Sequence, residues 1–263
     1  MELSAPIRAY YEQGGELNRL DLANGRLEFL RTRDVLRRVL PQAPARILDV
    51  GGATGAHARW LTADGYHVRV VDPVPLHVAH AATIPGVDAV RGDARRLDEP
   101  DATYQATLLL GPLYHLTDRA DRLAALREAV RVTAPGGVVA AATISRHVGL
   151  FDALRRGRYL QPEIRAFIDE EVATGVYDPQ GRDLFTLAYF HHADEITAEF
   201  AEAGLAGATR YALESAAWLF ADADGWLDDD ERTAHLLAAL RTVERDESML
   251  GISSHVLTVA TVG

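Results

Sequence analysis

The sequence predicts an α/β protein built on a mostly parallel sheet with helices on both faces. Between Arg46 and Ile144, short apolar runs and helical segments alternate five times, a pattern that calls for parallel strands joined by right-handed crossovers. The chain has 263 residues, enough for one large domain with a substantial core. We therefore expect a single domain that consists of an N-terminal helical arm (1–44), a core (45–144), a cap insertion (145–190) and a C-terminal part of the sheet (191–263).

The first elements follow from periodicity and from their end signals. Apolar residues recur at helical spacing from Glu16 to Leu40, before Pro41, and Gly25 could divide this stretch into two helices. Strands are expected at 47–50, 67–72 and 87–91. Helices are expected near 53–63, 74–82 and 118–132, and Asp118 is a candidate N-cap for the last of them.

Regular alternation lapses between Ser145 and Tyr189. A helix is expected at 162–173, followed by a loop rich in Gly, Asp and Pro at 175–183. Insertions of this length often form a lid, and this one follows the fifth strand, so it would overhang the site. After it we expect a helix at 193–203, a strand near 208–213, a helix at about 228–248 and a last strand at 255–260.

The stretch Arg46–Gly55 carries the clearest functional signal. A buried strand runs directly into glycines and then into a helix, which makes a cradle where backbone N–H groups and a helix N-terminus can face a nucleotide or nucleoside. Asp72 ends the next strand about 20 residues later, where a ribose-binding fold places an acid. Asp93 follows the third strand. Three strand ends at one edge of the sheet therefore carry the expected site.

The glycine spacing separates two cofactor classes. A dinucleotide fingerprint would need glycine at 51, 53 and 56, but positions 53 and 56 are alanine. The stretch instead resembles the first motif of the class I S-adenosylmethionine-dependent methyltransferases, an acid followed by three alternate glycines, here Asp49, Gly51, Ala53 and Gly55. Ala53 departs from that motif and adds bulk where the cofactor would approach the backbone.

The resemblance covers the order of motifs from residue 45 to 144 and extends beyond it. The stretches Gly111-Pro-Leu-Tyr-His-Leu116 and Phe185–His192 look like one subgroup of bacterial small-molecule methyltransferases. The family likeness implies a Rossmann-like sheet of seven strands with an antiparallel end, and S-adenosylmethionine as cofactor, with S-adenosylhomocysteine as product and no metal. It also implies transfer of a methyl group to O or N of a small molecule, conceivably in specialised metabolism.

The resemblance assigns cofactor roles to residues at the strand ends. Asp72 would accept both ribose hydroxyls, while Asp93 with the Ala94 N–H would meet the adenine edge. Asp49 would either hold the amino group of the cofactor or only tie down the turn. The complete set expected to hold the cofactor is Asp49, Gly51, Gly52, Ala53, Asp72, Pro73, Asp93, Ala94, Gly111 and His115.

Candidates for catalysis and acceptor binding come from less regular parts of the chain. His115 follows the fourth strand and could act as a base or only as a wall residue. Tyr11 either anchors the arm on the sheet or folds over the cofactor, and one of His191 and His192 is expected to point inward while the other caps a helix. His191 completes the catalytic candidates. Candidate acceptor residues are Tyr114, Arg146, Tyr189, Glu214 and His255.

Two other patterns predict no site. His77 and His80 have a metal-like spacing on one helix, but no third ligand is placed to join them, so we expect them to face solvent. The acidic stretch 222–231 resembles a calcium loop, but its glycine comes too early, and a solvated helix start is expected. Two other functions remain open, a nicotinamide-dependent oxidoreductase on the same kind of sheet and a non-catalytic S-adenosylmethionine-binding protein.

Composition limits the partners. The formal net charge of −11, without a basic stripe, argues against nucleic acid. There is no cysteine, which excludes disulfides and thiolate chemistry and fits a reducing cytoplasm. No apolar run has the length of a signal peptide core or a membrane span. We expect a cytoplasmic protein, monomeric or homodimeric, whose partner is a small-molecule acceptor.

Overall fold

The protein is described by a computed structural model that covers residues 7, 10–11, 23–182, 184–220 and 222–263. Its centre is a seven-stranded sheet in the order β3-β2-β1-β4-β5-β9-β8. The strands are β1 (Arg46–Val50), β2 (His67–Asp72), β3 (Val87–Arg91), β4 (Tyr104–Leu109), β5 (Thr133–Ile144), β8 (Thr209–Ala212) and β9 (His255–Thr261). The first five pair in parallel, and β9 pairs antiparallel with both β5 and β8. The predicted sheet, with its antiparallel last strand, is confirmed.

The order of the strands places a crevice beside β1. The chain builds outward from β1 through β2 to β3, then crosses back to β4 on the other side of β1. Ligands in open α/β sheets bind beyond the carboxyl ends of the strands at such a reversal. The glycine turn that follows β1 therefore lies at the favoured position in the fold.

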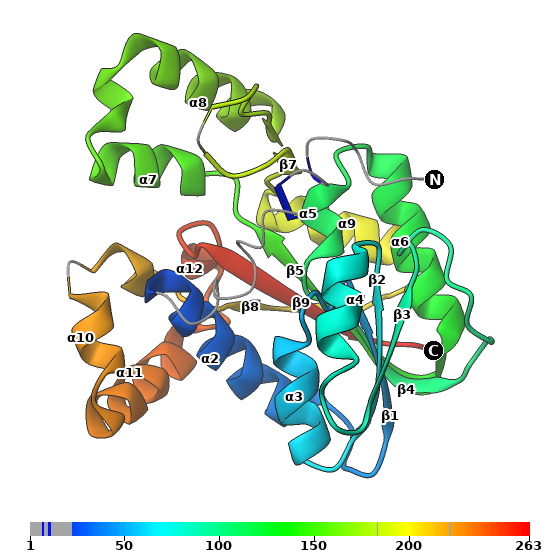
Figure 1. Cartoon of the computed structure of the whole chain (residues 1–263). Coiled ribbons are helices and arrows are strands. Elements are labelled where there is room, and N and C mark those ends of the chain that lie inside the picture. Colours follow the sequence, from blue (N-terminus) through cyan, green and yellow to red (C-terminus); the bar gives the residue numbers. More distant parts are fainter. Residues whose placement is uncertain (1–6, 8–9, 12–22, 183, 221) are drawn as a thin grey trace.

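Helices cover both faces of the sheet, as predicted (Figure 1). On one face α2 (Ala23–Val39), α3 (Ala56–Ala63) and α4 (Pro75–Ala81) pack against the sheet. On the other face lie α6 (Arg119–Val132) and α9 (Ala193–Glu202). The central strands are buried on both sides: every residue of β4 is buried except Gln105, which is half-buried.

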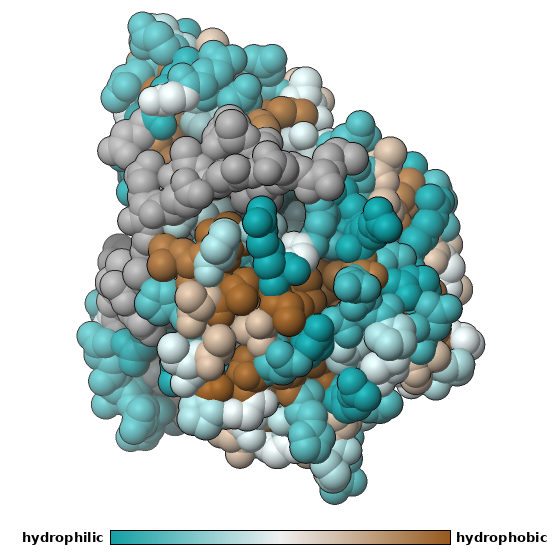
Figure 2. All heavy atoms as spheres, turned by 45° about the vertical axis from the view of Figure 1, so that its right-hand side comes forward, coloured by the Kyte–Doolittle hydropathy of each residue, from teal (hydrophilic) through white to brown (hydrophobic). Residues whose placement is uncertain are grey.

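The insertion after β5 forms a lobe that stands beside the sheet in Figure 1. It contains α7 (Val148–Arg155), the 3-10 turn η2 (Arg158–Leu160), α8 (Pro162–Thr174) and a small hairpin of β6 (Val176–Tyr177) and β7 (Ala188–Tyr189). The lobe has an apolar cluster of its own, which includes Phe167, Tyr177 and Phe190 and reaches Tyr114 of the core. On the face drawn in Figure 2 its surface is mainly hydrophilic. We call residues 145–190 the cap.

Several elements differ in detail from the prediction. Gly25 lies inside α2, so it does not divide that helix, while the predicted start at Glu16 falls outside the described residues. The single helix expected at 228–248 is two, α11 (Asp230–Val243) and α12 (Glu247–Leu250), because Asp246 caps a new start by accepting from the Ser248 N–H. A short helix, α10 (Ala223–Leu227), precedes them, after the 3-10 turn η3 (Ala217–Leu219).

The connection from β3 to β4 also differs, because residues 92–103 form turns rather than the helix that strict alternation would require. The predicted N-cap of α6 is confirmed, since the Asp118 carboxylate accepts from the Ala120 N–H at 2.8 Å. Within the described part of the chain, no helix combines the length and apolar character of a membrane span.

Candidate functional site

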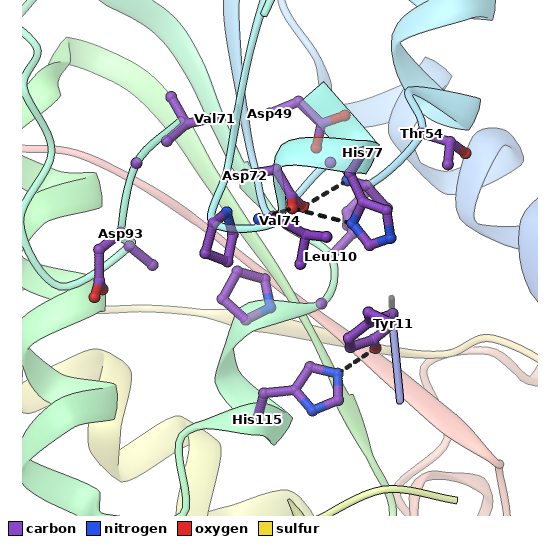
Figure 3. Close-up of a pocket in the computed structure, with 18 of the residues that line it drawn as sticks. Tyr11, Asp49, Thr54, Val71, Asp72, Val74, His77, Asp93, Leu110 and His115 are labelled. Atoms are coloured by element: carbon purple, nitrogen blue, oxygen red, sulfur yellow. Dashed lines mark hydrogen bonds and ion pairs between the residues drawn. The ribbon is translucent and has the colours of Figure 1, made fainter. Parts of the chain in front are cut away.

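A pocket opens at the carboxyl ends of β1 to β4, at the reversal in strand order. All the residues predicted to hold the cofactor line it, namely Asp49, Gly51, Gly52, Ala53, Asp72, Pro73, Asp93, Ala94, Gly111 and His115. Figure 3 shows how the labelled side chains surround it. Because each strand delivers its last residues to the same edge, side chains more than 40 positions apart in the sequence meet here.

The glycine turn after β1 depends on unusual backbone angles. Gly51 has a φ of +68°, and a Cβ atom there would lie 2.7 Å from Cγ of Pro112, the first residue of α5 (Pro112–His115). Ala53 takes a left-handed conformation, with φ +47°, that favours glycine. The turn is therefore left-handed at residue 53 although that residue is not glycine, and the Ala53 N–H donates to Asp72 Oδ2 at 3.0 Å.

Asp72 lies at the tip of β2 and is held by three groups of the protein. Besides the Ala53 N–H on Oδ2, its Oδ1 accepts from the Val74 N–H at 2.9 Å and contacts His77 Nδ1 at 3.0 Å (Figure 3). His77 is only 3% exposed and lines the pocket. The expectation that His77 faces solvent is wrong, because the first turn of α4 directs it to the strand end; His80 is exposed as expected.

Asp49 is a buried carboxylate, 1% exposed, with no hydrogen-bond partner among the described residues. Burial, together with the charge of Asp72, raises the pKa of Asp49 to about 7. Its Oδ2 lies so close to Gly52 that a Cβ there would come within 2.6 Å. A cation bound in the pocket would relieve the cost of this unpaired group.

Asp93 lies at the far side of the pocket and is tied to Arg95. The guanidinium donates to both carboxylate oxygens of Asp93, at 2.9 and 2.6 Å, and also to Asp121 at 2.6 Å. Burial alone would raise the pKa of Asp93, but the hydrogen bonds from Arg95 outweigh it and hold that pKa below its ordinary value. Asp93 is therefore a fixed anion at the tip of β3.

Two of the predicted catalytic residues meet across the pocket. The Tyr11 hydroxyl and His115 Nε2 are 2.5 Å apart (Figure 3). The Tyr11 ring is also in edge contact with the ring of His77, with a centroid distance of 5.3 Å. Tyr114, predicted to contact the acceptor, lines the same pocket. Tyr11 therefore contributes to the wall of the site.

Three other candidates lie outside this pocket, in a polar joint between cap and core. Arg146 donates to the Phe190 carbonyl at 2.7 Å and to Glu195 at 2.9 Å. The Tyr189 ring lies against the guanidinium of Arg122, whose Cζ is 3.9 Å from the ring centroid. His191 points inward, as expected, but toward Glu199 at 3.5 Å, and burial lowers the pKa of His191.

Glu214 and His255 also lie outside the pocket lining but connect to it. His255 Nδ1 is 2.7 Å from Glu214 Oε1, and its Nε2 is 3.9 Å from Glu28 Oε2. Glu28 comes from α2, lines the pocket and is 9% exposed. The sequence analysis missed Glu28, His57, His77 and Arg95. A polar residue on the buried face of a predicted helix was the available signal for Glu28. Among the described residues, no three His, Cys, Asp or Glu side chains gather as metal ligands would.

Comparison with known proteins agrees with this geometry. Residues 47–137 match the family model described as a methyltransferase domain. The likeness to a methyltransferase domain thus covers the part of the chain that contains the pocket's strand ends. The matched segment begins in β1 and ends in β5, so it contains the glycine turn and all three acidic strand ends.

Relatives of the domain include an uncharacterised methyltransferase of Mycobacterium tuberculosis, 37% identical over 101 residues, which are 38% of this chain and 40% of that protein. A ubiquinone/menaquinone biosynthesis C-methyltransferase of Rubrivivax gelatinosus is 35% identical over 125 residues, 45% of this chain and 49% of that protein. The matches thus span less than half the length of these relatives.

Solved methyltransferase structures share the fold across nearly the whole chain. An S-adenosylmethionine-dependent methyltransferase of Thermotoga maritima superimposes with a TM-score of 0.59 at 17% identity, over 98% of this chain and all of that one. A second, from Methanosarcina mazei, gives 0.57 at 18% identity, over 86% of this chain and 96% of that one. At these identities the likeness concerns the fold alone.

Proposed function

We propose that the protein transfers the methyl group of S-adenosylmethionine to O or N of a small molecule by in-line displacement. The observation that carries this proposal is the buried, unpartnered Asp49 beside Asp72 under the glycine turn of a methyltransferase domain. An uncompensated buried carboxylate is costly, and it is retained where a cation binds. The cofactor has two positive groups, its sulfonium and its α-ammonium.

The charges of the pocket support the same ligand. Four carboxylates line it, Glu28, Asp49, Asp72 and Asp93. Of the described lining residues, Arg95 is the one arginine, and it is bound to Asp93 and Asp121. A pocket lined by these carboxylates attracts the sulfonium and α-ammonium groups of S-adenosylmethionine. It repels the pyrophosphate of a nicotinamide cofactor. The oxidoreductase alternative therefore has no support from the site.

The Tyr11–His115 pair is the group we propose to face the transferred methyl. Methyl transfer from a sulfonium needs alignment and exclusion of water, and a base only when the acceptor carries a proton. His115 is already hydrogen-bonded to a hydroxyl, so an acceptor hydroxyl or amine could take the place of Tyr11 and lose its proton to Nε2. Tyr114 lines the adjoining wall and packs against the apolar cluster of the cap.

We infer a place in bacterial specialised metabolism, and in the cytoplasm, from the sequence resemblance of 111–116 and 185–192 to small-molecule methyltransferases and from the lack of cysteine. The proposed roles of Arg146, Tyr189, His191, Glu214 and His255 become those of supporting residues. They hold the cap and the pocket wall rather than contact the acceptor.

Calorimetric titration tests cofactor choice. We expect S-adenosylmethionine and S-adenosylhomocysteine to bind and NAD and NADP not to bind. Asp72→Ala should weaken binding at least about 100-fold, because it removes the ribose acceptor and the partner of the Ala53 N–H. Asp98→Ala, at an exposed position, is the matched control. Binding of NAD in place of S-adenosylmethionine would contradict the proposal.

Transfer itself is tested with radiolabelled methyl groups and a panel of small phenols, carboxylic acids and amines. Label should move to an acceptor in the wild type and much more slowly in His115→Phe. Tight cofactor binding without transfer to any acceptor would favour the non-catalytic alternative.

A further inference from the structure

The Asp72 carboxylate has less free capacity than the ribose requires. A carboxylate offers about four lone-pair positions, two on each oxygen. Oδ1 already accepts from the Val74 N–H and from His77, and Oδ2 accepts from the Ala53 N–H. One position on Oδ2 remains. Asp72 can therefore accept a hydrogen bond from one ribose hydroxyl. The other hydroxyl needs a second acceptor.

His77 supplies an acceptor on the same wall. With Nδ1 donating to Asp72, the neutral imidazole carries its lone pair on Nε2. This Nε2 is buried and has no hydrogen-bond partner among the described residues. Buried ring nitrogens normally find a partner, so an unpaired one at the edge of a pocket indicates that a ligand completes it. Figure 3 shows the ring between Asp72 and Tyr11.

We propose that Asp72 and His77 divide the ribose between them, with the carboxylate accepting one hydroxyl and His77 Nε2 accepting the other. This rests on the proposed use of S-adenosylmethionine. Nε2 is closed to solvent in this structure, and the Tyr11 ring packs edge-on against the His77 ring. A shift of the Tyr11 ring, which the arrival of the ribose would cause, is therefore part of the proposal.

The test is calorimetric binding of S-adenosylhomocysteine and of its 2′-deoxy and 3′-deoxy analogues. His77→Asn keeps a donor near the position of Nδ1 for Asp72 but has no atom at the position of Nε2. Wild type should lose about tenfold in affinity for each missing hydroxyl. His77→Asn should bind S-adenosylhomocysteine about tenfold more weakly and no longer distinguish it from one of the two analogues, while it still penalises the other.

Controls separate this role from a structural one. His77→Gln, whose amide reaches the position of Nε2, should restore the lost discrimination, and His80→Asn, on the exposed side of the same helix, should behave as wild type. Equal weakening of all three ligands by His77→Asn, or unchanged penalties for both deoxy analogues, would overturn the proposal and leave His77 as a support for Asp72. If wild type binds S-adenosylhomocysteine at no concentration, the proposed function itself has failed.

Discussion

At the scale of single residues, we expect Asp49 to make binding of the proposed cofactor depend on pH. Its pKa is raised to about 7 by burial and by Asp72, and a bound cation would favour its ionised form. Affinity for S-adenosylmethionine should therefore rise as pH increases through about 7, by up to about tenfold between pH 6 and pH 8. Calorimetry at several pH values measures this slope.

The matched variant is Asp49→Asn, which removes the titrating group at nearly constant volume. Its affinity for the cofactor should be lower at pH 8 and almost independent of pH. A slope equal to that of the wild type would assign the pH dependence to another group in the pocket, such as Glu28 or His57.

Glu171 in the cap provides a second residue-scale prediction. It is fully buried, and neither carboxyl oxygen has a partner among the described residues. Burial raises the pKa of Glu171 to about 8, and the charge of Arg146 opposes the shift only in part. A raised folded-state pKa means that the stability contributed by the neutral acid is complete below the unfolded value and is lost as pH rises through about 8.

Glu171→Gln should therefore be more stable than wild type at pH 8, by on the order of 2 kcal/mol, with a much smaller difference near pH 5. Denaturant unfolding at both pH values measures the difference. Glu170→Gln is the control, because Glu170 is the exposed neighbour on the same helix and should change stability little at either pH. A pH-independent difference for Glu171→Gln would contradict the assigned protonation state.

At the scale of elements, the glycine turn predicts opposite effects on stability for substitutions at positions 51 and 53. Ala53→Gly should stabilise the fold by about 1 kcal/mol, because Ala53 has a φ of +47° that glycine adopts without strain. Gly51→Ala should destabilise it by at least about 2 kcal/mol, since it adds strain at φ +68° and a Cβ 2.7 Å from Pro112. Thermal unfolding of both variants measures the effects. Shifts of the same sign would show that the turn relaxes.

Several helices, strands and caps could be predicted from local sequence patterns alone. The first helix over its described part (Ala23–Val39), the strands and the Asp118 cap are confirmed, because apolar periodicity and capping act within a few residues of the chain. The break between α11 and α12 was missed. Asp246 can cap a new helix only if the preceding helix ends. The Glu244 carbonyl accepts from the Ala212 N–H of β8, so it is paired with the sheet at the end of α11.

At the scale of the whole molecule, a buried polar joint holds the cap, the core and the pocket together. Arg122 on α6 pairs with Glu199 on α9 at 2.8 Å, and both are about 2% exposed. The same guanidinium lies on the ring of Tyr189 in β7 and donates to the Leu116 carbonyl, next to His115. Displacement of Arg122 would therefore disturb both the cap, through Tyr189, and the pocket, through Leu116.

Glu199→Gln should destabilise the protein by on the order of 3 kcal/mol, because it leaves a buried guanidinium without its countercharge. Glu202→Gln removes a comparable but exposed pair with Arg119 and should change stability far less, because solvent screens the pair. Chemical denaturation compares the two. Equal costs would mean that water reaches the joint.

The sequence by itself determined the sheet, its antiparallel last strand and the set of pocket residues that we expect to hold the cofactor. These depend on strands that end in glycine or aspartate, and parallel strands always bring their carboxyl ends to one edge. Only the tertiary structure decided the direction of His77, the arrival of Glu28 at the pocket, and the withdrawal of Arg146, Tyr189 and His191 into the joint. Those placements depend on how the helices and the cap pack against the sheet. Packing between segments far apart in the sequence produces no periodic pattern of residues from which it could be predicted.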